Sequence, residues 1–350
     1  MGASISGAMG GHRHSDCSAD PSVMDRGIRA VVVSSVGLLA TFGLQIAVVW
    51  LGQSAALLAD AIHNLADVFT SVPLWIAFVL SRRQADRRFT YGYGRAEDLA
   101  GVTVVLFIIA SSVFAGYQAA QKWFTHTPTT HLGLGMAAAL IGAVGNEIVA
   151  TYKIRVGKAI GSAALVADGQ HSRADALTSV GAFLGILGVF WGFPWADPLM
   201  GLLISVAILY IAWDAGREVF ARMMDAIEPE AVEQIERVAG AIDGVHGVDE
   251  VRARWIGHRV RIELAIQVDP GLTVAEGHRI AEEVRHELLH HIPRLADAHI
   301  HVNPAWEGVD QYHAVTAPHF EPLIPSFSPE GSLRRAQSSE GKVGGSGDTR

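Results

Sequence analysis

The run Leu57-Leu58-Ala59-Asp60-Ala61-Ile62-His63-Asn64-Leu65-Ala66-Asp67-Val68-Phe69-Thr70-Ser71-Val72 occurs twice in this chain. The second copy extends from Leu165 to Val180, and nine of its sixteen positions are identical to the first. Asp60, His63 and Asp67 recur at the same offsets as Asp168, His171 and Asp175. Identity at this level between two apolar segments indicates an internal repeat.

Each copy lies inside a hydrophobic run long enough to cross a bilayer. A carboxylate at such a depth costs on the order of 3 kcal/mol or more, and it commonly marks an ion or proton pathway. His-x-x-x-Asp is an i, i+4 spacing, so imidazole and carboxylate leave one helix face about a turn apart. Two such helices face to face offer two nitrogens and two oxygens, the tetrahedral set that Zn²⁺ accepts.

The composition indicates a membrane protein. Of 350 residues, 50% are apolar and only 18% are charged, and the mean hydropathy is +0.28. The formal charge of −8 and the lack of a basic stripe with aromatics argue against nucleic-acid binding. Cys17 is the single cysteine, which excludes an intrachain disulfide and a multi-cysteine zinc site.

Six apolar spans follow one another, each near or above the ~20 residues that a bilayer requires. They cover residues 28–51, 54–80, 96–120, 132–152, 160–190 and 195–215. Arginine and lysine gather before the first span and in the connections after the second and fourth, whereas the other side has only Lys122. By the positive-inside rule, both termini are expected in the cytoplasm, with the protein in the inner cell membrane.

This topology predicts that the two motifs lie at one depth. At 1.5 Å per residue, His63 lies roughly 13 Å below the outer end of its span, and His171 roughly 16 Å from the inner end of its own. Both positions are near the midplane, where repeated transporter elements form substrate sites. The alternative is two buried polar pairs that only hold helices together.

Other polar residues inside the spans have expected roles of their own. Asp60 and Asp168 precede each histidine by three residues and are expected to orient its imidazole. Asn146 and Glu147 lie in the fourth span. Glu147 is close to Lys153 and to the cytoplasmic end, where a structural pair is expected and a role in transport is the alternative.

After the sixth span the pattern is that of a soluble α+β domain. A helix is expected from Pro229 to about Ile242, strands over 246–256 and 259–268, and a last strand near 298–303. Thr273 and Glu276 form a capping-box signature for a helix to about His291. The expected organisation is a disordered cytoplasmic tail (1–26), a six-helix transmembrane domain (27–216), a linker with a cytoplasmic αββαβ, ferredoxin-like domain (217–304), and a disordered tail (305–350).

With the repeated Asp-x-x-His-x-x-x-Asp, six spans and an αββαβ domain, residues 27–304 resemble the cation diffusion facilitator family. The resemblance implies a homodimeric, proton-coupled exporter of divalent cations. His-x-x-x-Asp in both helices resembles the zinc-preferring branch, so zinc is the expected substrate and not a resident cofactor. The transport ligands it implies are His63, Asp67, His171 and Asp175.

The resemblance also implies contacts and a further site. Arg95, in Gly92-Tyr93-Gly94-Arg95, would pair with Asp225 to join the two domains. Asp249, His278 and His301 match positions of a weak or regulatory cytoplasmic metal site, although Ala265 and Asn303 stand where stronger sites have His and Asp. The loop after the second span keeps Asp86, but Phe89 and Tyr93 replace the two histidines of another family site, which is therefore expected to be absent.

The sequence therefore predicts a zinc/proton antiporter rather than an enzyme. One alternative is the same fold with cobalt, cadmium, iron or manganese as substrate, because N/O sites bind several divalent metals. Another is an intramembrane metalloenzyme, which would need three ligands, a bound water and usually a His-Glu-x-x-His helix. A third is a transport-inactive sensor subunit, which would be expected to have lost one of the four ligands.

Overall fold

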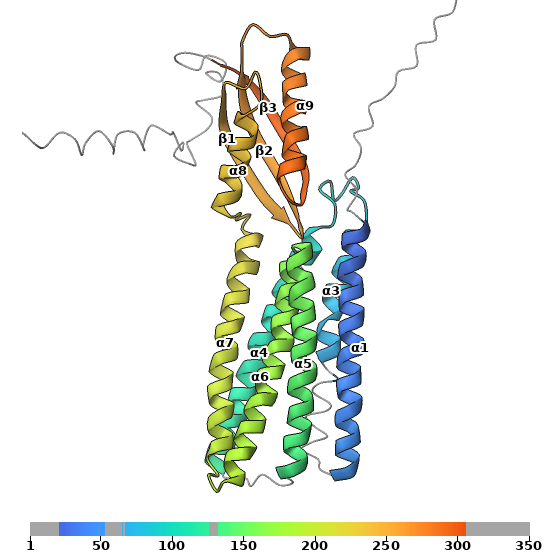
Figure 1. The fold of residues 1–350 in the computed structure, drawn as a ribbon, viewed down its shortest axis with the longest axis vertical. Coiled ribbons are helices and arrows are strands. Elements are labelled where there is room, and N and C mark those ends of the chain that lie inside the picture. Colours follow the sequence, from blue (N-terminus) through green and yellow to red (C-terminus); the bar gives the residue numbers. More distant parts are fainter. Residues whose placement is uncertain (1–20, 53–64, 66, 126–131, 306–350) are drawn as a thin grey trace, which may run out of the picture. The chain divides into compact units, whose positions relative to one another are not determined.

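The computed structural model describes residues 21–52, 65, 67–125 and 132–305. Within these ranges, five helices are long and apolar enough to cross a membrane (Figure 1). They are α1 (Pro21–Gly52), α4 (Arg95–Thr125), α5 (Leu132–Ile160), α6 (Ala163–Phe190) and α7 (Ala196–Met223). Even the shortest, with 28 residues, extends about 42 Å, beyond the ~30 Å of a hydrocarbon core.

The predicted second span is described only in its last part. Residues Asp67–Ser81 form a shorter apolar helix, and its regular portion after Ser71 is α3 (Val72–Ser81). Proline is tolerated in the first turn of a helix, which accounts for Pro73 at the start of α3. The beginning of this span lies outside the described residues, so the sixth crossing stays a prediction.

Small residues bring α5 and α6 close together. A Cβ atom on Gly169 would lie 2.6 Å from the side chain of Ile154 and 2.9 Å from its backbone nitrogen. One on Gly157 would lie 2.9 Å from the backbone nitrogen of Val166. Close approach through small residues is typical of membrane helices. It places the C-terminal half of α5 directly beside the first turns of α6.

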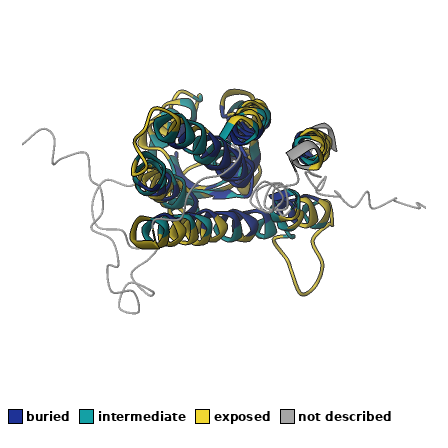
Figure 2. Ribbon diagram, turned by 90° about the horizontal axis from the view of Figure 1, so that it is seen from below, coloured by how far each residue is buried: buried dark blue, intermediate teal, exposed yellow. Residues whose placement is uncertain are grey.

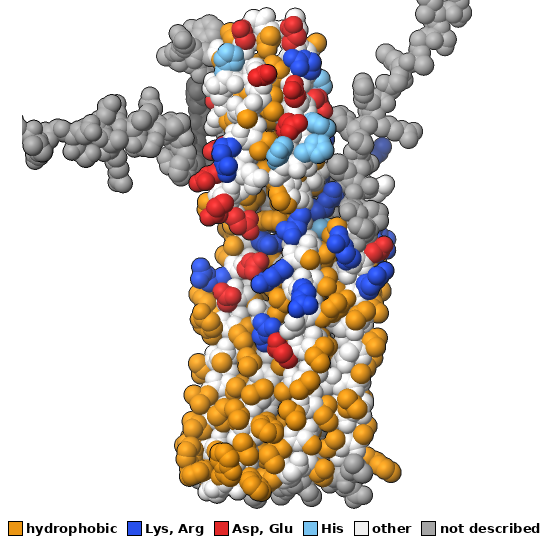
Figure 3. Space-filling model, viewed as in Figure 1, with side chains coloured by type: hydrophobic (Ala, Val, Ile, Leu, Met, Phe, Trp, Pro, Cys, Tyr) orange, Lys and Arg blue, Asp and Glu red, His pale blue; other side chains and the backbone are white. Residues whose placement is uncertain are grey.

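The helices are apolar on the outside. Figure 3 shows hydrophobic side chains over the surface of the helical part, and Figure 2 shows buried residues on the inward faces. Val36, Leu106 and Tyr210 are among the exposed large side chains, whereas Ser112 and Asn146 are buried. An apolar exterior around a partly polar interior is the pattern expected in lipid.

The helices run further than the apolar spans. α1 begins at Pro21 and α7 ends at Met223, so both helices extend beyond the apolar spans predicted at 28–51 and 195–215. α5 likewise continues to Ile160, beyond the apolar span predicted at 132–152. Hydropathy locates the apolar part of a helix, whereas backbone hydrogen bonds continue into polar flanks.

The C-terminal domain has the predicted αββαβ order. Its elements are α8 (Pro229–Gly240), β1 (Gly247–Ile256), β2 (Arg259–Val268), α9 (Val274–His291) and β3 (Leu295–Pro304). The sheet order is β1-β2-β3, and β1 pairs antiparallel to β2 with Ala253 opposite Ile262. The tight turn between them contains Gly257 at a φ of 60°, a conformation that glycine adopts without strain.

Strand β2 forms the centre of this domain's core. Ile262 and Ile266 are buried on one face, and they share a core cluster with Ile235 of α8 and Val284 of α9. The predicted alternation along this strand is confirmed. The capping box is confirmed too, because the Glu276 carboxylate accepts from the backbone N–H of Thr273 at 2.8 Å while the Thr273 hydroxyl accepts from the N–H of Glu276 at 3.3 Å.

Candidate metal centre

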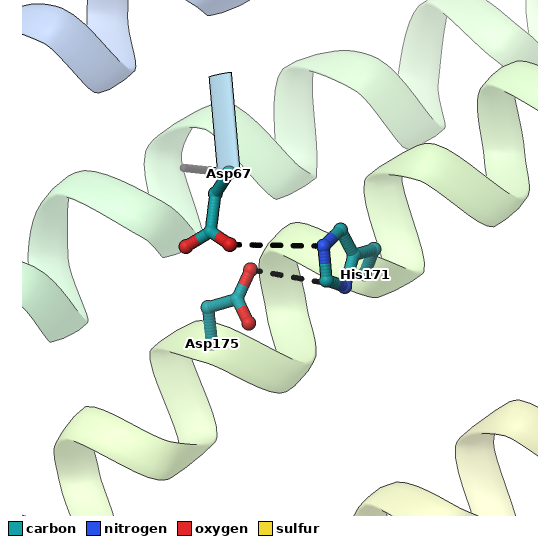
Figure 4. Close-up of side chains that lie close together, drawn as sticks. All are labelled: Asp67, His171 and Asp175. Atoms are coloured by element: carbon teal, nitrogen blue, oxygen red, sulfur yellow. Dashed lines mark ion pairs between the residues drawn. The ribbon is translucent and has the colours of Figure 1, made fainter. Parts of the chain in front are cut away.

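Three residues of the repeated motif lie together inside the helical bundle. Asp67 precedes α3, and His171 and Asp175 are one turn apart on α6. His171 Nε2 lies 3.9 Å from Asp67 Oδ1, and His171 Nδ1 lies 4.0 Å from Asp175 Oδ2 (Figure 4). All three side chains are buried. Two helices that carry copies of one motif therefore direct their ligand atoms toward one point.

The spacing of these atoms suits a small metal ion. One ligand atom from each residue lies within 4.8 Å of the others. A tetrahedral ion with bonds of ~2.0–2.2 Å holds its ligands roughly 3.3–3.6 Å apart. The separations of 3.9 and 4.0 Å start from different nitrogens of the His171 ring, and with one ligand atom from each residue the separations stay within 4.8 Å. The side chains would therefore move closer together on binding an ion. Among the described residues, this is the one group of three or more His, Cys, Asp or Glu side chains spaced for a metal ion.

The predicted fourth ligand, His63, lies outside the described residues, as does Asp60. Their roles therefore stay predictions.

Asp168, which was predicted to orient the imidazole, contacts residues of two other helices. Its carboxylate instead forms an ion pair with Lys153 of α5 at 2.8 Å and accepts from the Ser71 hydroxyl at 3.0 Å. Sequence reasoning placed Lys153 in a cytoplasmic connection because lysine is costly in lipid. In the structure α5 continues past Lys153 to Ile160. The Lys153 ammonium group is buried there, which is tolerated because the Asp168 carboxylate lies beside it.

Glu147 is paired, but with a different residue from the one predicted. Its carboxylate accepts two hydrogen bonds from the guanidinium of Arg173 on α6, at 2.9 and 3.3 Å. The predicted partner Lys153 is occupied by Asp168. Asn146 is fully buried, and within the described ranges neither of its amide atoms has a hydrogen-bond partner.

Arg95 and Asp225 form the ion pair that the resemblance implied. Arg95 begins α4, and Asp225 follows the end of α7. The Arg95 guanidinium also donates to the backbone carbonyl of Arg222 at 3.2 Å and to the Asp98 carboxylate at 3.3 Å. The pair therefore joins the ends of two membrane helices at the point where the chain leaves for the C-terminal domain.

A second connection between the helices and the C-terminal domain was missed at the sequence level. His258, beside the β1–β2 turn, lies 2.9 Å from the carboxylate of Glu97, and both side chains are buried. The N–H of Gly257 donates to Asp98 at 3.3 Å. The sequence signal for this contact was the pair of acidic residues in the first turn of α4, Glu97 and Asp98. Carboxylates at this position also interact favourably with the helix dipole.

Asp86 makes contacts inside its own loop. Its carboxylate accepts from the Tyr93 hydroxyl and from the backbone N–H groups of Arg88 and Phe89, each at 2.7 Å. The Tyr93 hydroxyl and these N–H groups hold the pKa of the Asp86 carboxyl below its ordinary value. Tyr93, which stands where the resemblance implied a histidine, thus donates to this carboxylate.

The predicted cytoplasmic site is not assembled within a single chain. Asp249 lies on β1, His278 on α9 and His301 on β3, and across residues 229–304 they do not form a group spaced for a metal ion. The Asp249 carboxylate instead accepts from the amides of Gln267 and Asn303. Asn303, which stands where an aspartate would add a ligand, therefore holds the carboxylate itself.

Comparison with known proteins identifies the family. The model described as "Cation efflux transmembrane domain" matches residues 31–224, and "Cation efflux protein, cytoplasmic domain" matches residues 227–305. Together they cover the membrane helices and the C-terminal domain.

Several curated proteins are similar over most of their length. A "probable cation efflux system protein" of Mycobacterium tuberculosis is 48% identical over 282 residues, 81% of this chain and 85% of its own. The uncharacterized transporter YdbO of Bacillus subtilis is 33% identical (76% and 91%), and the manganese efflux system protein MneP of the same organism is 30% identical (73% and 89%).

A solved structure of a MamM CTD variant in its nickel form covers 23% of this chain and all of that chain, at 29% identity and a TM-score of 0.22. The family models and the curated relatives carry the assignment. This chain belongs to the cation diffusion facilitator family, whose members are membrane proteins of cation efflux.

Proposed function

We propose that this chain exports divalent cations, zinc foremost, across the cytoplasmic membrane in exchange for protons, and that it acts as a homodimer. The observation that carries the proposal is the buried group of Asp67, His171 and Asp175, whose ligand atoms lie within 4.8 Å of one another. His63, which occupies the position of His171 in the first copy of the repeat, completes the proposed set of two nitrogens and two oxygens.

Zinc is favoured by the imidazole nitrogens. Zn²⁺ takes nitrogen and oxygen ligands in tetrahedral sites, whereas Mn²⁺ prefers carboxylate, carbonyl and water oxygens and a higher coordination number. Manganese is the second candidate, because one relative at 30% identity is named as a manganese efflux protein.

Protons provide a route for releasing the metal. A metal ligand must be deprotonated, so protons and metal compete for the same atoms. The His171 ring and the two carboxylates within 4.0 Å of it are the groups for which protons and metal would compete. Zinc would bind from the cytoplasm, and alternating exposure would then let outside protons displace it.

Orientation and assembly follow from charge and from the second domain. Basic residues concentrate in the connection after α3, on the side of the C-terminal domain, which supports cytoplasmic termini. The second family model belongs to the cytoplasmic domain of cation efflux proteins, which supports pairing of two copies through this domain.

The rival functions have less support. The one His-Glu-x-x-His run of the sequence, His286–His290, lies on α9 of the C-terminal domain and not in a membrane helix. At the proposed centre, four protein ligands leave no position for a catalytic water. A transport-inactive sensor subunit would not need a complete set of ligands, and all four motif residues are present.

Zinc flux into reconstituted vesicles with an imposed pH gradient tests the proposal. Wild-type protein should transport zinc, and Asp175→Ala should lose at least ~90% of the flux because opening the shell removes a charged ligand. Thr178→Ala is the matched control on the same helix, since the Thr178 hydroxyl donates to the Ala174 carbonyl one turn earlier. Zinc flux in Asp175→Ala equal to that of the control would contradict the assignment of Asp175 as a metal ligand.

A further inference from the structure

A second buried charge group lies beside the metal centre. Lys153 and Asp168 are 1% and 0% exposed and form an ion pair at 2.8 Å. The Lys153 ammonium also donates to the hydroxyls of Ser71 at 3.0 Å and Ser172 at 3.2 Å, and Ser71 donates to Asp168. A charge in this part of a membrane protein is expensive unless it is paired and hydrogen-bonded, and this lysine is both.

The ion pair is one helical turn from the proposed metal ligands on both of their helices. Ser71 follows Asp67 by four residues, and Asp168 precedes His171 by three. Lys153 belongs to α5, which carries no proposed ligand, and its side chain reaches the helix of Asp67 and the helix of His171 together. A change of charge on this pair therefore changes the electrostatic potential at the metal centre, because the medium between them has a low dielectric constant.

The signs of the charges decide what the pair does there. Asp67 and Asp175 contribute two negative charges and a divalent cation neutralises them. Asp168 alone would add a third negative charge, and Lys153 alone would repel the incoming cation. Paired, they add no net charge, so the filled centre and its surroundings are neutral together.

We propose that Lys153 and Asp168 set the charge of the metal centre, with Lys153 acting as a resident cation that limits how tightly the divalent ion is held. This inference rests on the proposed function of the Asp67, His171 and Asp175 group. An exporter must release its cargo, and a third uncompensated carboxylate would slow that release.

The test uses opposite shifts of zinc affinity. Equilibrium zinc binding is measured by chelator competition on the full-length protein at one fixed pH, and the same titration of Asp175→Ala identifies the contribution of the membrane site. Lys153→Met should lower the half-saturating zinc concentration at that site about tenfold, because Asp168 is left uncompensated. Asp168→Asn should raise it about tenfold, because the ammonium is left uncompensated. A role in packing alone would shift both variants in one direction.

Two further variants keep the result decisive. Lys122→Met removes another ion pair of the bundle, with Asp197, and should leave zinc affinity unchanged. If either single variant does not fold, the uncharged double variant Lys153→Met/Asp168→Asn should bind zinc within about threefold of wild type, since the net charge is preserved.

Shifts in the same direction, no shift, or a tenfold shift in the double variant would overturn the charge-setting role. A wild-type protein whose zinc binding does not depend on Asp175 would instead overturn the proposed function itself.

Discussion

Arg95 and Asp225 are 130 residues apart in sequence and form an ion pair where the membrane helices end. Their side chains are 37% and 44% exposed, so the pair contributes at most about 1 kcal/mol to stability. Its importance is geometric, because Asp225 begins the connection between α7 and α8. Arg254 of β1 also lies 3.7 Å from Asp225, so one carboxylate contacts a membrane helix and the sheet.

Reversal of these two charges tests whether the contact couples the domains. Arg95→Asp should reduce zinc flux severalfold because it places an acid beside Asp98 and Asp225. Arg95→Asp/Asp225→Arg should recover more flux than either single reversal. Asp225 has a φ of 60°, which aspartate and asparagine tolerate better than longer side chains, so Asp225→Asn serves as the control that removes charge alone. A double variant no more active than the singles would mean that the two charges do not act as a pair.

Cation preference is predicted to depend on His63. His63→Asp keeps four ligands at i, i+4 spacing but exchanges a nitrogen for a carboxylate, which accommodates more than four ligands. The variant should still transport zinc and gain Cd²⁺ or Mn²⁺ transport, with a shifted pH dependence because the empty site gains a negative charge. Competition of each ion against zinc flux in vesicles measures this. An active variant with wild-type preference would place selectivity elsewhere.

The cytoplasmic domain is predicted to dimerise, with metal tightening the dimer. Residues 227–304, which follow α7, contain a core of their own around β2, so the isolated segment is expected to fold. Because Asp249, His278 and His301 do not meet within one chain, a metal that uses them would bind across two chains. Sedimentation of the isolated domain with and without zinc checks this, and His278→Ala/His301→Ala should remove the zinc effect. A monomer under both conditions contradicts the prediction.

The capping box predicts a pH-dependent stability of the same domain. The backbone N–H of Thr273 and then its hydroxyl hold the pKa of Glu276 below its ordinary value of 4.5. A lowered pKa in the folded state stabilises the fold above that value and stops doing so as pH falls through the folded pKa.

Glu276→Gln should therefore unfold at lower urea concentration than wild type at pH 7, and the difference should shrink as pH falls below 4.5 and vanish below the folded pKa of Glu276. Glu233→Gln, an exposed position in the middle of α8, is the control. A Glu276→Gln deficit that persists at low pH would show that the ionised carboxylate is not its cause.

Much of the local structure and three of the proposed ligands could be predicted from the sequence. The period-2 pattern of β2 and the capping signature at Thr273 depend on neighbours within a few residues, and both were correct. The repeat identified Asp67, His171 and Asp175 as candidate ligands, because a charged side chain in an apolar run is costly in a bilayer and usually has a function.

The sequence did not indicate which charged residues form ion pairs with one another. Asp168 was assigned to a histidine three residues away and Glu147 to Lys153, but the structure pairs Asp168 with Lys153 and Glu147 with Arg173. Periodicity indicates which residues share a face of one helix. It does not indicate which face of the next helix is opposite or at what height.

The sequence by itself determined the class of protein, the order of its helices and strands, and the motif that carries the proposed metal centre, because each of these depends on hydrophobic periodicity and short-range spacing. Only the tertiary structure decided that Lys153 is buried beside that centre and that His258 contacts Glu97 across 161 residues. Both contacts arise from how closely helices and strands pack, which the side chains at each interface set together and no single segment encodes.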